Sequence, residues 1–262
     1  MRMPFVAMLV LGLMSALPAV AQSTDDDAAR AEHWRELQQA IFDDRSVIDG
    51  GDLVTLDAPK RALDAALVPI TITTAAGQGV AALYLVIDDN PGPLAAQVRF
   101  GPAGDPSHLA LRVRVNQYTL MHAVAETTDG RLLETTRFVK AAGGCSAPVG
   151  ENEAASLAEI GRMKLRLGDA PVAGQPAEAQ IMIRHPNYNG MQMDQLTRLY
   201  TPMRIVQTVD ISFNDEAVLH LEGDISLSSD PVIGFRFLPK QLPGKLKVVV
   251  RDSDDAVFEQ SF

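Results

Sequence analysis

The chain has 262 residues, of which 47% are hydrophobic and only 5% aromatic, and it carries 33 acidic against 23 basic residues. The formal net charge of −10 argues against nucleic acid and anionic membranes as partners, because both would repel the chain. A single cysteine, Cys145, excludes an internal disulfide. The fold must therefore be stabilised by packing.

The first segment of the chain has the pattern of a secretory signal peptide, predicted over residues 1–21. Arg2 gives a basic start, residues 5–17 are apolar, and an Ala-Val-Ala cleavage site follows at 19–21. The apolar run is too short to cross a bilayer. We therefore expect a protein that is exported to the periplasm and then cleaved.

One helix is expected, followed only by strands. Apolar residues recur at helical spacing from Trp34 to Ile41, which predicts an amphipathic helix over 29–43. Beyond this helix the hydrophobic period becomes two, which is typical of strands. Six strands are predicted in the first half: 68–73, 80–88, 94–100, 108–116, 118–126 and 131–140.

A break in this pattern divides the chain. Residues 141–150 are small and glycine-rich, and residues 151–160 are acidic and alanine-rich. Such composition is typical of a domain boundary. Seven further strands are predicted at 163–167, 177–185, 203–213, 217–222, 231–238, 245–252 and 256–262. The predicted fold is all-β, with a short N-terminal helix and two immunoglobulin-like β-sandwich domains, at 29–142 and 161–262, joined by a linker at 143–160.

Cys145 is the strongest candidate for chemistry. Gly143 and Gly144 precede it, and glycines leave the backbone mobile and cannot bury a neighbour, so we predict a flexible arm with an accessible thiol. Such a thiol could carry a group covalently between partners. No cation or helix N-terminus lies nearby in the sequence, which predicts an ordinary thiol pKa. An incidental linker cysteine is the alternative. Because an exposed linker side chain contributes little packing, we expect Cys145→Ser to leave the stability nearly unchanged.

Two other chemistries are weaker interpretations. A cysteine hydrolase needs a histidine within hydrogen-bond reach of the thiol, and no sequence signature links a histidine to Cys145. His185, Met191 and Met193 could bind copper, although methionines at this spacing are more often packing residues. No hydrolase, zinc or nucleotide-binding motif occurs. We therefore predict no catalytic residue, no metal and no cofactor.

The segment ending at Cys145 resembles the sulfur carrier SoxY, and the second half resembles its partner SoxZ. Residues 139–145 match the end of SoxY-like chains, in which the last strand runs into a glycine-rich tail that bears the carrier cysteine. The resemblance implies that the first sandwich is SoxY-like and the second SoxZ-like. Further similar segments are 67–70, 92–96 and 112–117 in the first half, and 183–186 and 200–206 in the second.

The fusion, together with residues 58–66, is similar to SoxYZ-like carriers described as quinoprotein-dehydrogenase-associated. The resemblance implies a non-enzymatic carrier that holds a sulfur-containing intermediate, as in thiosulfate oxidation, on Cys145. Its partners would be periplasmic oxidoreductases such as c-type cytochromes or a quinoprotein dehydrogenase. The alternative is an accessory module for such a dehydrogenase or cytochrome, with a redox-active thiol.

The chain departs from separate SoxY in how its cysteine is tethered. Cys145 is attached on both sides, and the following Ser146-Ala147-Pro148 stiffens the exit. We predict a mainly monomeric protein, with a partial disulfide dimer through Cys145 under oxidant. Since separate SoxY and SoxZ associate, we also expect the two domains to meet through an apolar interface.

Overall fold

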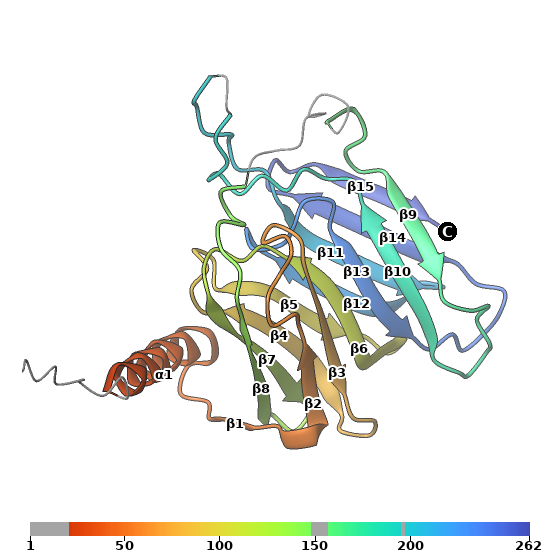
Figure 1. The fold of residues 1–262 in the computed structure, drawn as a ribbon. Coiled ribbons are helices and arrows are strands. Elements are labelled where there is room, and N and C mark those ends of the chain that lie inside the picture. The colour runs from red at the N-terminus through yellow and green to blue at the C-terminus, as the bar shows by residue number, and fades with distance from the viewer. Residues whose placement is uncertain (1–20, 148–156, 195–196) are drawn as a thin grey trace, which may run out of the picture.

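Two β-sheets packed face to face form the body of the protein, and one helix lies beside them (Figure 1). The computed structural model describes residues 21–147, 157–194 and 197–262. The predicted signal peptide lies outside these residues except for Ala21, where the helix α1 (Ala21–Phe42) begins. No helix in the described ranges is long and apolar enough to cross a membrane.

The larger sheet has nine strands and the smaller has six. In spatial order the larger contains β1 (Val47–Asp49), β8 (Leu132–Val139), β7 (Thr119–Thr127), β4 (Val80–Ile87), β5 (Leu94–Phe100), β12 (Glu216–Gly223), β11 (Val206–Phe213), β14 (Leu246–Asp252) and β15 (Val257–Ser261). The smaller contains β2 (Val54–Asp57), β3 (Val68–Thr74), β6 (Gly104–Val113), β13 (Val232–Phe237), β10 (Ala177–Ile183) and β9 (Met163–Leu167).

Both sheets run without interruption from the first half of the chain into the second. Strand β5 pairs with β12 in the larger sheet, and β6 pairs with β13 in the smaller. Each half therefore forms its own sandwich, and the two sandwiches are joined edge to edge. A single hydrophobic core extends through both. The predicted fold class is confirmed, and the expected apolar interface is accompanied by strand pairing, which gives the backbone groups of four sheet edges their partners.

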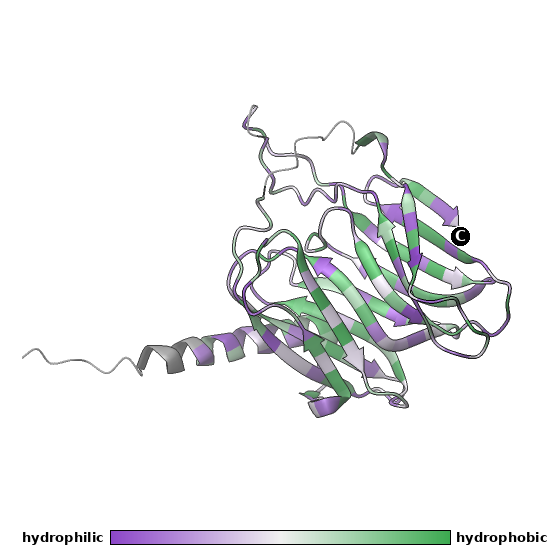
Figure 2. Cartoon of the chain, turned by 45° about the vertical axis from the view of Figure 1, so that its right-hand side comes forward, coloured by the Kyte–Doolittle hydropathy of each residue, from purple (hydrophilic) through white to green (hydrophobic). Residues whose placement is uncertain are grey.

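The strand predictions were incomplete at three places. Strands β1 and β2 were missed because three and four residues are too few for a period of two to be recognised. Strand β6 begins at Gly104 rather than at 108, because Gly104 and Asp105 pair with Phe237 and Arg236 of β13 despite their turn-like sequence. Hydrophobic and hydrophilic residues alternate along the strands in Figure 2, as the sequence pattern predicted.

The helix α1 packs on the outer face of the larger sheet through aromatic contacts. Trp34 stacks on His122 of β7 with ring centroids 3.7 Å apart, and Phe42 meets Tyr84 of β4 edge to face. The ring of His122 is buried below Trp34. These contacts fix the helical face that the sequence predicted as apolar.

Candidate functional site

The segment after β8 crosses the end of β6 and is held there by its backbone. The amides of Gly143 and Gly144 donate to the carbonyls of Asn116 and Val115 at 2.8 and 2.9 Å. Gly143 has φ +79°, a conformation that favours glycine. At Gly144 an added Cβ would collide with the carbonyl oxygens of Ala65 and Val115. The two glycines, predicted to form a flexible arm, here allow the arm to dock closely against the body.

Cys145 is buried at the end of this docked arm. Its exposed fraction is 0%, and its carbonyl accepts a hydrogen bond of 2.8 Å from the side-chain amide of Asn189. Burial raises the pKa of the Cys145 thiol to about 11, against the opposing effect of the Arg114 guanidinium. The predictions of an accessible thiol and of an ordinary pKa are therefore wrong for this conformation. The physical reason is that a loop of the second half covers the cysteine.

The covering loop follows β10 and is fixed by buried amide side chains. Asn187 donates to the carbonyl of Leu227 and accepts from the amide of Val206, both at 2.8 Å. The side-chain carbonyl of Gln192 accepts from the amide of Asn189 at 3.0 Å, which orients Asn189 toward the arm. Because buried polar groups need such partners, these bonds define one loop conformation. Figure 1 shows this loop beside the segment that follows β8.

Arg114 is a buried cation at the same site. Its side chain is 3% exposed, and Nη1 donates to the carbonyls of Asn187 and Leu227 at 2.9 and 2.6 Å. Burial lowers the pKa of Arg114 to about 10, and the nearby Cys145 opposes this shift. Within the described residues no carboxylate forms an ion pair with Arg114. The sequence analysis did not find this residue, because nothing local distinguishes it from an exposed strand arginine.

His185, one of the three residues considered as copper ligands, has a role in the fold. His185 is buried, with Nε2 3.4 Å from Asp252 Oδ2 and Nδ1 accepting from the amide of Asn187 at 3.0 Å. Both ring nitrogens thus have protein partners, and burial lowers the pKa of His185. Over the described ranges, no group of three or more His, Cys, Asp or Glu side chains is arranged to hold a metal ion. Met193, in contrast to His185, is 36% exposed.

Three other histidines have their partners on the larger sheet and its loops. His33 and His122 belong to the contact between α1 and the larger sheet, where His122 lies between Asp88 and Glu134 at 3.0 and 2.5 Å. His220 pairs with Asp210 on the neighbouring strand β11. None of these contacts involves Cys145.

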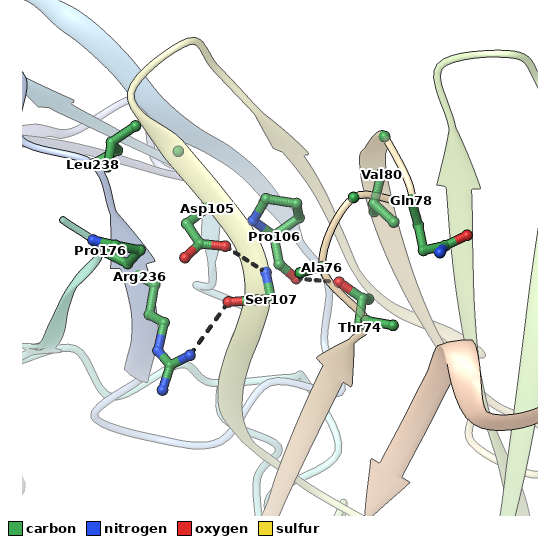
Figure 3. Close-up of a pocket in the computed structure, with 14 residues that line it drawn as sticks. Thr74, Ala76, Gln78, Val80, Asp105, Pro106, Ser107, Pro176, Arg236 and Leu238 are labelled. Atoms are coloured by element: carbon green, nitrogen blue, oxygen red, sulfur yellow. Dashed lines mark hydrogen bonds between the residues drawn. The ribbon is translucent and has the colours of Figure 1, made fainter. Parts of the chain in front are cut away.

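A cavity lies where β3 ends and β6 begins. It has a volume of about 760 Å³ and is lined by Thr74 at the end of β3 and by Asp105 near the start of β6, among others. Figure 3 shows Arg236 reaching toward Ser107 there, at 3.4 Å. Cys145 lies beyond the opposite ends of β3 and β6, so this cavity is separate from the thiol.

Comparison with protein families matches both halves of the chain. Residues 38–145 match SoxY, described as sulfur oxidation protein SoxY, and residues 165–262 match SoxZ, described as sulphur oxidation protein SoxZ. The chain is a SoxYZ-like fusion protein. Its SoxY match ends at Cys145, and the loop that covers this cysteine belongs to the SoxZ domain. The predicted resemblance is therefore confirmed, and the site is built across the junction of the two domains.

Solved structures give weaker likenesses. The sulfur carrier protein SoxY from Chlorobium limicola f thiosulfatophilum is 22% identical, with a TM-score of 0.39, and the match covers 45% of this chain and 99% of that chain. A β-glycosidase from Bacteroides vulgatus is 10% identical, with a TM-score of 0.25, over 80% of this chain and 24% of that chain. A search of curated proteins finds no match.

Proposed function

We propose that the protein is a non-enzymatic periplasmic carrier that holds a sulfur-containing group covalently on Cys145 for partner oxidoreductases. The observation that carries this proposal is the position of Cys145. It is the last residue of the SoxY match and the sole thiol of the chain, and its carbonyl accepts a hydrogen bond from Asn189 of the SoxZ domain. The signal-peptide pattern supports the periplasmic location.

Thiosulfate is the cargo that the family match favours. On loading, the sulfur of Cys145 and the outer sulfur of thiosulfate form an S–S bond. The thiol proton passes to solvent, and two electrons pass to a partner oxidoreductase such as a c-type cytochrome. The product is a thiosulfonate with one negative charge. The chain supplies the thiol and the partner supplies the oxidising power, so the role is that of a carrier.

Loading requires the arm to leave its docked position. A thiol with a pKa of about 11 holds very little of the nucleophilic thiolate at neutral pH, and its 0% exposure excludes a partner. The docked arm is held by the hydrogen bonds at Gly143, Gly144 and the Cys145 carbonyl. At about 1 kcal/mol each, such bonds permit local opening without global unfolding. In the docked state the thiol would be protected. In the released state it would take up or give up its sulfur-containing group.

Intact mass spectrometry of the protein isolated from its native periplasm tests this proposal. We expect a fraction with added mass on Cys145, as a persulfide, sulfonate or thiosulfonate, that dithiothreitol removes. Protein with Cys145→Ser, isolated in parallel, is the control and should carry none. A thiol found only unmodified or in a simple disulfide dimer would contradict the carrier role and favour an accessory module for a dehydrogenase or cytochrome.

A further inference from the structure

We propose that Arg114 is the counter-ion of an anionic sulfur group on Cys145, and that it selects anionic cargo for the docked arm. The inference rests on the proposed carrier function and adds the charge of the cargo and the residue that recognises it. Its basis is the placement of a buried cation beside a buried thiol where two domains meet.

Among the described residues, no negatively charged side chain pairs with the guanidinium of Arg114. At 3% exposure it has lost most of its hydration, and its hydrogen-bonding partners, the carbonyls of Asn187 and Leu227, are neutral. No acidic side chain among the described residues makes an ion pair with it. Removing a cation from water is costly unless an anion accompanies it. A buried cation without an anionic partner is therefore expected where an anion binds during function.

The unloaded thiol does not supply that anion, whereas the loaded one does. The buried Cys145 thiol is neutral at physiological pH, since its pKa is raised to about 11. A thiosulfonate or persulfide at the same position is negatively charged. A guanidinium carries five N–H donors in a planar fork, and the bonds to Asn187 and Leu227 use only Nη1. No described residue accepts a hydrogen bond from Nε or Nη2, so we infer that these donors serve a sulfonate or a persulfide sulfur.

The two domains build this counter-ion together. Arg114 lies just past β6 in the SoxY domain, and the carbonyls that orient it belong to the SoxZ domain. The amide of Asn189, which binds the Cys145 carbonyl, comes from the same SoxZ loop as Asn187. The SoxZ domain therefore positions both the arm and the cation, so the recognition of cargo requires the fused partner.

Chemical loading of Cys145 tests the charge selection directly. Methanethiosulfonate reagents react with the single thiol to form a mixed disulfide and release a sulfinate. Two reagents of similar length leave a sulfonatoethyl group, which is anionic, or a trimethylammonioethyl group, which is cationic. The rate at which dithiothreitol removes each group is measured in the folded protein and in protein unfolded in urea. For each adduct, the ratio of the rate in unfolded protein to the rate in folded protein measures the protection by docking. The intrinsic reactivity of the adduct cancels in this ratio.

We expect docking to protect the anionic adduct about 10-fold to 100-fold more than the cationic one, the range of one charged hydrogen bond. Arg114→Met should abolish this difference, and Arg114→Lys should retain part of it. The matched control is Arg112→Met, because Arg112 lies two residues away, near the end of β6, but is exposed. This control should behave like the wild type.

Several results would overturn the inference. Equal protection of the two adducts in the wild type, or no protection of either, would show that charge is not recognised. A difference that survives Arg114→Met would assign the selection to another group. If Arg114→Met does not fold, the wild-type comparison and Arg114→Lys still decide. Since the loading is chemical, failure here is distinct from failure of the carrier function, which mass spectrometry of the native protein reports.

Discussion

Replacing Gly144 by alanine should release the arm and expose the thiol. The added Cβ would meet the carbonyl oxygens of Ala65 and Val115, and both belong to the backbone of the body. Val115 is buried, and its amide donates to the Ala65 carbonyl at 2.8 Å, so this backbone moves less readily than an arm tied by a few hydrogen bonds. The arm should therefore move away, taking Cys145 out of its covered position.

The size of the effect follows from the thiol pKa. On release, the pKa of Cys145 should fall from about 11 toward its ordinary value of 9.0. A fall of two units raises the thiolate fraction at pH 7.5 about 100-fold, while the lower basicity reduces the nucleophilicity of each thiolate about tenfold. The net gain is about tenfold from the pKa alone, and access to solvent adds to it.

The assay is the rate of alkylation by iodoacetamide at pH 7.5, followed by intact mass. The control is Gly143→Asn, because the space around Gly143 is open and asparagine tolerates its positive φ. We expect Gly144→Ala to react at least about tenfold faster than the wild type and Gly143→Asn to stay within about twofold. Equal rates for Gly144→Ala and the wild type would refute the docked arm as the cause of low reactivity.

Three further predictions follow from burial and pairing. Cys145→Ser should lower the free energy of unfolding by about 1–3 kcal/mol, as for other buried groups; a urea midpoint unchanged from the wild type would show an exposed thiol. Burial lowers the pKa of His122, but the hydrogen bonds to Asp88 and Glu134 raise it overall. The stabilisation by His122 is therefore complete below its unfolded pKa of about 6.5 and is lost as pH rises through its higher folded pKa. Urea midpoints of the wild type and His122→Gln should converge with rising pH, and a constant gap would contradict this. Proteolytic cleavage between the two domains should leave them together on a sizing column at micromolar concentration, because paired strands and a shared core join them; free halves would contradict it.

The sequence was sufficient for features that depend on neighbouring residues. A period of two and turn residues predicted the main strands, because side chains alternate between the faces of a sheet whatever the tertiary context. The single cysteine after two glycines identified the residue of interest, and the similar segments around it identified the family. The edge strands β1 and β2 were too short to carry such a signal.

The tertiary structure alone decided the state of the thiol and the role of the arginine. Arg112 and Arg114 fall within one predicted strand, on the same face, and look equivalent in the sequence, yet Arg112 is exposed and Arg114, just past β6, is buried. The difference arises because Asn187 and Leu227, distant in sequence, close over Arg114. The same loop covers Cys145, whose glycine neighbours suggested exposure. Burial and charge environment are set by segments that meet only in the folded chain, so a local pattern does not reveal them.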